Sequence, residues 1–392
     1  MTNVISKKLL KLLIYIPNAD VVSPRSIRTH QMCYFLSKSD IKVSIVTNDV
    51  GNPHEKWNSF NIHRLSASMI LQMGSLYKYR TTKSWIGCQI ARIFNKIVQS
   101  KSQHDIWDLQ VSKAMKYIES INDEFDTLVL SIWPFSSYDL SSKLKEKYRD
   151  NIRIILDIGD PLAFNAASAY DGLDVEAYER RALEGANALI VTNEATKLEF
   201  KDRYNLDCPI EVVPQGFDPL LFTRVKKSTT SKKSISIIYA GALYSELRPI
   251  QPFVEGMLDC KDDSINLTIC GVSTGSNSNR ITYLPRMSQE ELVKYYHGSD
   301  ILLFIDNSYG VQTPGKIYEL LAIGKPILFL YKFESETYHI AKKFDQIIFV
   351  KNETDSIAHI LDSIDDLLMS LSSNYPDKHT WEQRAIKYKK AL

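Results

Sequence analysis

Short apolar runs alternate with amphipathic segments of helical period along almost the whole chain. The apolar runs are near-continuous rather than alternating, which is typical of parallel strands covered on both faces. The predicted strands are residues 11–16, 42–47, 127–132, 152–158, 188–192 and 210–214, then 235–241, 265–271, 281–285, 300–306 and 326–331. Strands that alternate with helices in this way predict an α/β fold.

A polar, basic stretch, TRVKKSTTSKKS, separates the two series of strands and carries no apolar anchor. We interpret residues 223–234 as a linker. It would join an N-terminal domain, residues 1–222, to a C-terminal domain, residues 235–378, each large enough to bury its own core. Two such sheets predict two Rossmann-like domains facing each other across a cleft, with ligands at the carboxyl ends of the strands.

Charge, cysteine content and apolar runs bear on the partners and the cellular compartment of the protein. The 392 residues carry a net charge of +2, so the overall charge gives no reason to expect a nucleic-acid partner. The cysteines are scattered, odd in number and without C-x-x-C spacing, which indicates free thiols in a reducing compartment. No apolar run is long enough to span a bilayer. The N-terminal apolar run is interrupted by Lys11 and followed by Pro17, so we interpret it as a strand rather than a signal peptide.

The stretch TPGKIYELLAIGKP, residues 313–326, carries the strongest chemical signal. It begins as a Gly/Pro turn, continues as a helix with Lys316 and Glu319 on one face, and stops at Gly324 before a strand. A helix N-terminus with a lysine on its first turn suits a phosphate or diphosphate. Glu319 could then accept hydrogen bonds from sugar hydroxyls beside that phosphate. The alternative is an ordinary helix with a solvated Lys and Glu.

This stretch resembles the nucleotide-binding signature P-x-K-x-x-E-x-x-A-x-G-K-P of GT-B glycosyltransferases, in its family-4-like form (glycosyltransferase group 1). Other landmarks follow in that family's order: IIYAGAL, LTICGV and SQEELVKYYHGSDILLF. The resemblance implies that Glu319 binds the donor ribose and that Gly241 and Gly315 lie at the donor site. It also implies that the closing segment, residues 379–392, is the last helix and packs back on the first domain.

The resemblance extends to the residues that would hold the donor diphosphate. Relatives usually carry an Arg and a Lys soon after the glycine that ends the first strand of the second domain. Here Ala242 follows that glycine and the only basic residue is Arg248. Arg248 together with Lys316 would supply the two charges, since arginine can hold a diphosphate bidentately. The alternative for Arg248 is a surface arginine. The first carboxylate of the relatives' E-x7-E pattern is replaced by Val311.

Two further candidates lie in the N-terminal domain. In the families that this chain resembles, the loop after the first strand contacts a phosphate or the acceptor and is often glycine-rich. Here that loop contains no glycine, so Ser23, Arg25 and Arg28 would have to make those contacts through side chains. The alternative is a helix cap at Ser23 with surface arginines. By resemblance, Asp160 at the end of the strand IILDI is the candidate base that takes the acceptor's proton. A turn aspartate before Pro161 is the alternative.

The segment from Arg64 to His104 is basic, partly apolar and free of acidic residues. Isoleucines recur in it at helical spacing, and Lys83, Trp85, Arg92 and Lys96 lie among them. A basic amphipathic helix suits an anionic membrane surface. The alternative is a core-facing isoleucine stripe with a solvated basic face.

The resemblance, together with these patterns, implies a glycosyltransferase that moves a sugar from a nucleotide-diphosphate sugar to a hydroxyl of a glycan or polyprenyl-linked acceptor. We expect a bacterial enzyme of surface polysaccharide synthesis, cytoplasmic and peripheral on the inner face of the membrane. No metal-ligand spacing appears and no cofactor is expected. Alternatives are a sugar-nucleotide epimerase on the same fold, which would need no lipid acceptor, and a non-catalytic GT-B scaffold.

Overall fold

The computed structural model describes residues 9–51, 53–67, 72, 89–90, 93, 107–148, 151–166, 174–224, 234–271, 278–372 and 374–392. The chain divides into two compact units. Unit 1 contains Met1–Asn165, Ala169–Pro214 and, in addition, the C-terminal segment Trp381–Leu392. Unit 2 contains Gln215–Thr380 together with the short segment Ala166–Ser168. The sequence placed the end of the first domain at residue 222, whereas Phe217 and Phe222 are buried in the core of unit 2.

Unit 1 is built on a seven-stranded sheet in the order β3-β2-β1-β4-β5-β6-β7, and all neighbouring strands are parallel. Its strands are β1 (Leu10–Tyr15), β2 (Ile41–Asn48), β3 (Asn61–Leu65), β4 (Thr127–Ile132), β5 (Arg153–Ile158), β6 (Ala188–Val191) and β7 (Ile210–Val212). Its helices are α1 (Pro24–Ser37), α4 (Asp108–Ser120), α5 (Ser136–Tyr148), α6 (Val175–Glu184), α7 (Glu194–Tyr204) and α14 (Trp381–Tyr388).

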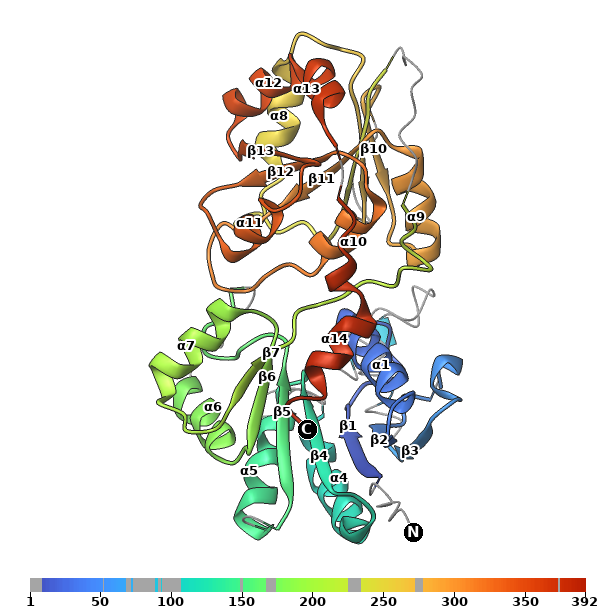
Figure 1. The fold of residues 1–392 in the computed structure, drawn as a ribbon, viewed down its shortest axis with the longest axis vertical. Coiled ribbons are helices and arrows are strands. Elements are labelled where there is room, and N and C mark those ends of the chain that lie inside the picture. Colours follow the sequence, from blue (N-terminus) through green and yellow to red (C-terminus); the bar gives the residue numbers. More distant parts are fainter. Residues whose placement is uncertain are drawn as a thin grey trace, which may run out of the picture. The chain divides into compact units, whose positions relative to one another are not determined.

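Two apolar layers cover the two faces of this sheet. Because side chains alternate along a strand, Leu13 packs with α4 and α5 on one face, while Leu12 and Ile14 pack with α1 and α14 on the other. Figure 1 shows α14, drawn in red, beside α1, drawn in blue, and contacts between the two helices agree with this view. A segment from the end of the chain therefore completes the core of the first unit.

Unit 2 has a six-stranded parallel sheet in the order β10-β9-β8-β11-β12-β13. Its strands are β8 (Ser236–Ala240), β9 (Asn266–Cys270), β10 (Ile281–Leu284), β11 (Ile301–Ile305), β12 (Ile327–Tyr331) and β13 (Ile347–Lys351). Its helices are α8 (Gln251–Asp259), α9 (Gln289–Gly298), α10 (Lys316–Ile323), α11 (Glu336–Ala341), α12 (Thr354–Leu361) and α13 (Ile364–Ser370).

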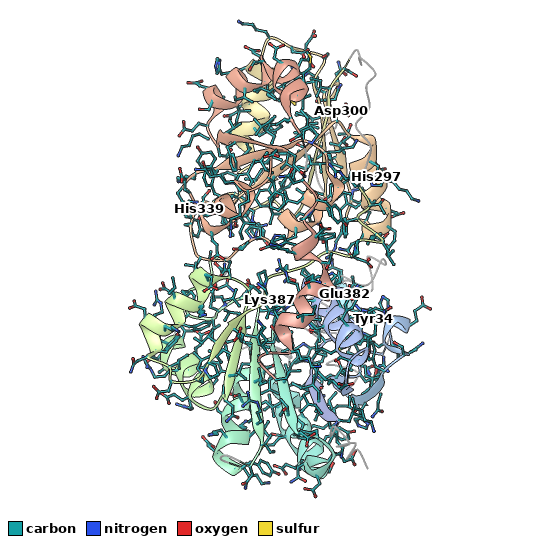
Figure 2. All side chains as sticks on the ribbon, viewed as in Figure 1. Tyr34, His297, Asp300, His339, Glu382 and Lys387 are labelled. Atoms are coloured by element: carbon teal, nitrogen blue, oxygen red, sulfur yellow. The ribbon has the colours of Figure 1, made fainter. Side chains whose placement is uncertain are left out.

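The amino ends of the two central strands of unit 2 are tied together. The carboxylate of Asp300, just before β11, accepts hydrogen bonds from the backbone N–H (3.0 Å) and the hydroxyl (2.6 Å) of Ser236 at the start of β8. Figure 2 labels Asp300, which lies between α9 and β11, and His297 in the last turn of α9. The edge that binds ligands in such sheets is the opposite one, where the strands end.

Candidate functional site

The topology of unit 2 defines a switch point between β8 and β11. These neighbouring strands are joined to their successors in opposite directions across the sheet, which is the place where open α/β sheets bind ligands. Gly241 directly follows β8, and Asp306 and Asn307 directly follow β11. Gly271 ends β9 with a positive φ of 106°, and a Cβ there would lie 2.9 Å from the Gly241 carbonyl oxygen. Glycine at this position lets the two turns approach closely.

Arg248 is fixed at this switch point. Its Nε donates a hydrogen bond to Asn307 Oδ1 (2.7 Å), and Asn307 Nδ2 donates to the Gln312 carbonyl (2.9 Å). The guanidinium also lies over the Tyr244 ring, 5.3 Å from its centroid. Neither terminal NH2 group of Arg248 donates to another of the described residues. The half-buried Arg248 guanidinium is therefore oriented through its Nε, while its two NH2 groups remain available to an anion.

Asp306 precedes Asn307, the partner of Arg248, and is almost completely buried, at 3% exposure. Its carboxylate accepts hydrogen bonds from the Ser335 hydroxyl and from the Asn307 backbone N–H. Burial raises the pKa of Asp306 to about 6, and these hydrogen bonds only partly oppose that rise. The site therefore holds a carboxyl group whose charge depends on pH near neutrality.

Helix α10 brings Lys316 and Glu319 together on its first turn, with Gly315 as the N-cap. Lys316 Nζ lies 2.7 Å from Glu319 Oε2, while Glu319 Oε1 accepts a hydrogen bond from Gln289 Nε2 on α9 (3.0 Å). Burial alone would lower the pKa of the Lys316 ammonium, but Glu319 and the Tyr296 phenol together outweigh burial and raise that pKa. Lys316 is therefore a cation at any physiological pH. The sequence did not indicate Gln289.

Arg248 and Lys316 both affect the pKa of the Tyr239 phenol, near the end of β8. Burial raises the pKa of the Tyr239 phenol, and the positive charges of Arg248 and Lys316 each oppose that rise. The Tyr239 hydroxyl donates to the carbonyl of Ala242, in the turn that follows Gly241 (3.1 Å). Arg248, Lys316 and Gly241 thus belong to one site at the carboxyl edge of the sheet, as does Glu319 through its ion pair.

In unit 1, Ser23, Arg25 and Arg28 make internal contacts. Ser23 is the N-cap of α1 and forms a capping box with Ser26. Arg25 Nη1 and Arg28 Nη2 lie 3.1 and 3.4 Å from Asp157 Oδ1, and all three side chains are buried. Burial would raise the pKa of Asp157, but the two guanidinium charges outweigh it and lower that pKa. Both arginines are therefore buried against one carboxylate inside the unit rather than displayed at its surface.

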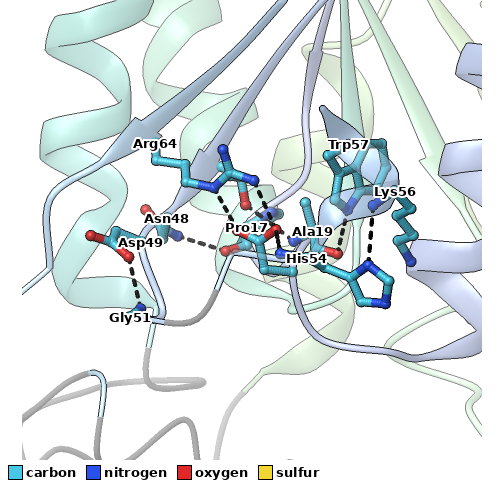
Figure 3. A network of polar contacts seen from close by, with 11 residues as sticks. Pro17, Ala19, Asn48, Asp49, Gly51, His54, Lys56, Trp57 and Arg64 are labelled. Atoms are coloured by element: carbon cyan, nitrogen blue, oxygen red, sulfur yellow. Dashed lines mark hydrogen bonds and ion pairs between the residues drawn. The ribbon is translucent and has the colours of Figure 1, made fainter. Parts of the chain in front are cut away.

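The glycine-free loop after β1 is held by side chains (Figure 3). The Ala19 N–H donates to Thr47 Oγ1 (3.1 Å), and the Ala19 carbonyl accepts from Trp57 Nε1 (2.8 Å). The Asp20 carboxylate accepts two hydrogen bonds from Arg64, at 2.8 and 3.0 Å. Sequence reasoning missed this network, whose members are far apart in the chain. It occupies the backbone N–H of Ala19, which is the group of that residue that could otherwise donate to a phosphate.

Asp160 is exposed and follows β5 directly after Gly159. The membrane-surface candidates Lys83, Trp85, Arg92 and Lys96 lie outside the described residues. Within the described part of the chain, no helix is long and apolar enough to cross a bilayer. The same residues contain no group of three or more His, Cys, Asp or Glu side chains placed to hold a metal ion.

No protein-family model matches the sequence, and no curated protein matches it significantly. Solved structures match the fold over nearly the whole chain. Sucrose-phosphate synthase from Thermosynechococcus elongatus is 12% identical and covers 97% of this chain and 98% of its own, with a TM-score of 0.68. The lipopolysaccharide outer core galactosyltransferase WaaB is 11% identical and covers 98% and 99%, with a TM-score of 0.57. The fold is GT-B.

The predicted fold class is thereby confirmed, while the reaction is not determined by it. A UDP-GlcNAc 2-epimerase from Neisseria meningitidis, solved with UDP-GlcNAc bound, is 11% identical and covers 98% of this chain and 99% of its own, with a TM-score of 0.54. Transferases and epimerases thus share this GT-B fold, and at such identities the likeness shows the fold alone.

Proposed function

We propose that the protein is a glycosyltransferase, of the family-4-like kind, that moves a sugar from a nucleoside-diphosphate sugar to a hydroxyl of a glycan or lipid-linked acceptor. The observation that carries the proposal is the placement of two cations at the switch point of unit 2. Arg248 is hydrogen-bonded to Asn307 just after β11, and Lys316 begins α10, the helix that follows β11. Two oriented cations at this place suit a diphosphate, because the charge of a leaving diphosphate grows in the transition state.

Each residue of the site has a role in this reaction. Arg248 offers its two NH2 groups to the diphosphate, and Lys316 adds a second positive charge beside it. Glu319, held by Lys316 and Gln289, accepts hydrogen bonds from the ribose hydroxyls. Asp160 takes the proton of the acceptor hydroxyl. The proposed mechanism assigns charge neutralisation to side chains and requires no metal ion.

A nucleotide-binding measurement tests the donor site. A ligand that binds only the folded protein raises the melting temperature, so one of UDP, GDP, dTDP and CMP should do so. Arg248→Ala and Lys316→Ala should each remove most of that shift. Lys294→Ala replaces an exposed lysine on α9, away from the switch point, and should leave the shift intact. Equal shifts in all three variants would remove Arg248 and Lys316 from the donor site.

An epimerase is the second candidate, since epimerases match the chain over the same length with TM-scores of 0.53 and 0.54. An epimerase acts on the nucleotide sugar alone and leaves it attached to its nucleotide. Incubation with donor and no acceptor separates the two reactions. A transferase gives at most slow hydrolysis, whereas conversion of the sugar without its release would replace the transferase proposal.

We further propose a setting in bacterial surface polysaccharide synthesis, with the protein cytoplasmic and bound at the inner face of the membrane. The support is the basic, apolar segment from Arg64 to His104, which contains no acidic residue. Charge-neutral variants of Arg92 and Lys96 should bind vesicles of anionic lipid several-fold more weakly. Undiminished vesicle binding by these variants would exclude this segment as the anchor.

A further inference from the structure

A buried carboxylate, Glu179 on α6, lies beneath the segment that carries Asp160. The Glu179 side chain is completely buried, and each of its oxygens accepts two hydrogen bonds. Oε1 accepts from the Tyr138 hydroxyl and the Leu162 backbone N–H, both at 2.7 Å. Oε2 accepts from the Tyr204 hydroxyl (2.8 Å) and the Ala163 backbone N–H (3.1 Å).

Four groups fill the acceptor positions of the Glu179 carboxyl oxygens. Two of the four are backbone N–H groups, which can only donate, and the other two are phenol hydroxyls. In the described part of the chain no Lys or Arg pairs with it. Burial, followed by the charge of Glu179, raises the pKa of both the Tyr138 and the Tyr204 phenols. The carboxylate is therefore balanced by hydrogen bonds alone.

Burial of a carboxyl group costs free energy that its hydrogen bonds must offset, so the contacts of Glu179 indicate its role. Two of the four hydrogen bonds go to the backbone of Leu162 and Ala163, just after Asp160 and Pro161. On the other side of Asp160, the Gly159 carbonyl accepts a hydrogen bond from Thr192 Oγ1 (3.2 Å). The Arg25 guanidinium packs against the Gly159 Cα, where a Cβ would lie 1.7 Å from Arg25 Nη2.

The segment is thus held on both sides of one exposed carboxylate. Before Asp160 the fixed points are Thr192 and Arg25, and after it Glu179 holds two successive N–H groups. Pro161 restricts the backbone between them. We propose that Glu179 is a positioning residue that fixes the backbone of Gly159–Ala163 and so presents the Asp160 carboxylate to the acceptor hydroxyl. The Asp160 part of this inference rests on the proposed function, whereas the anchoring of the segment does not.

Hydrogen exchange tests the anchoring, first in the unsubstituted protein and then in Glu179→Gln. In the unsubstituted protein, the amides of Leu162 and Ala163 should exchange as slowly as the amides inside β5. In Glu179→Gln, which keeps the shape but places an NH2 group against the backbone N–H groups, the same two amides should exchange at least tenfold faster. If both amides of the unsubstituted protein exchange at the rate of exposed loop amides, the inference is overturned.

Steady-state kinetics tests the consequence for Asp160. Glu179→Gln should lower kcat at least tenfold and leave the KM for the donor within about twofold, because the donor site lies in unit 2. The control is Ser141→Ala, which removes another buried hydrogen bond to α6 (Ser141 Oγ to the Ala182 carbonyl, 3.1 Å) without touching the Asp160 segment. That variant should keep its kcat.

The outcomes separate the two proposals. Equal kcat values in Glu179→Gln and Ser141→Ala, in a protein that does transfer sugar, would reduce Glu179 to a structural residue and overturn the positioning role. The amides of Leu162 and Ala163 could exchange slowly in the unsubstituted protein and faster in Glu179→Gln, while the protein transfers no sugar. That result would support the anchoring and count against the glycosyl-transfer proposal alone.

Discussion

At the scale of single residues, the buried carboxyl group of Asp306 should make the free energy of unfolding depend on pH. Its folded-state pKa is about 6, against an ordinary value of 3.8, because burial disfavours the charged form. Between these values the folded protein holds a proton that the unfolded chain has lost. The free energy of unfolding should therefore fall as pH rises from about 4 to about 7, by about 2–3 kcal/mol.

Asp306→Asn removes that titration and checks its sign. The difference in unfolding free energy, unsubstituted protein minus Asp306→Asn, should fall by that same amount over the same range of pH. Urea unfolding at several pH values measures both curves. Two curves that stay parallel would show that the carboxyl keeps its ordinary pKa in the folded protein.

Residues of the site differ in how far the sequence could reveal them. Lys316 and Glu319 are three positions apart on a helix, so local geometry predicts their shared face, and they lie within 2.7 Å of each other. Arg25 and Arg28 owe their orientation to Asp157, more than 120 positions away along the chain. No local pattern encodes such a partner. Glu179 was missed for the same reason.

At the scale of elements, the end of α10 depends on a glycine. Gly324 is the C-cap with φ of 75°, and a Cβ there would lie 2.8 Å from Arg224 Cγ. Gly324→Ala should lower the free energy of unfolding by about 1–2 kcal/mol, because a left-handed backbone disfavours a side chain. Gly298 offers a matched control: it is the last residue of α9 and has no atom within 4 Å of its would-be Cβ.

The control variant should lose no stability. Gly298→Ala should be neutral or raise the free energy of unfolding by up to about 1 kcal/mol, since alanine favours helix. Chemical denaturation of both variants measures the contrast. A Gly324→Ala variant as stable as Gly298→Ala would show that the cap tolerates a side chain.

The strands show which elements the sequence predicts well. Every strand expected from an apolar run is present, because buried parallel strands leave a near-continuous apolar signature. Two strands were missed, β3 and β13, and both are at sheet edges. In β3 only Leu65 is buried, so its sequence NIHRL has no apolar run to detect. The predicted linker, residues 223–234, lies mostly outside the described residues.

At the scale of the whole molecule, both sheets follow one plan. The first six strands of unit 1 and the six of unit 2 have the same order relative to the sequence, with the switch point beside the first strand of each. Alternating strands and helices predict this class of fold, because parallel strands need crossover connections. The exact point of division between the units does not follow from the pattern, since it depends on which core buries Phe217 and Phe222.

The C-terminal segment makes unit 1 depend on residues that follow unit 2 in the chain. Trp381, Ala385, Tyr388 and Ala391 are buried in the core cluster that also contains residues of α1. The Tyr388 hydroxyl donates to Asp157 Oδ2 (3.2 Å), and the Arg153 side chain donates to the carbonyls of the last two residues. Loss of one large aromatic residue from a core costs about 3–5 kcal/mol.

Removal of Trp381–Leu392 should therefore cost unit 1 most of its stability, which for a domain is about 5–15 kcal/mol. Unit 2 ends at Thr380 and keeps its whole core. Hydrogen exchange on the truncated chain should find fast amides in β1 and β4 and slow amides in β8 and β11. Ile386→Ala, at an exposed position of α14, is the control and should change stability by less than about 0.5 kcal/mol. Slow amides throughout unit 1 of the truncated chain would mean that α14 covers a core already stable without it.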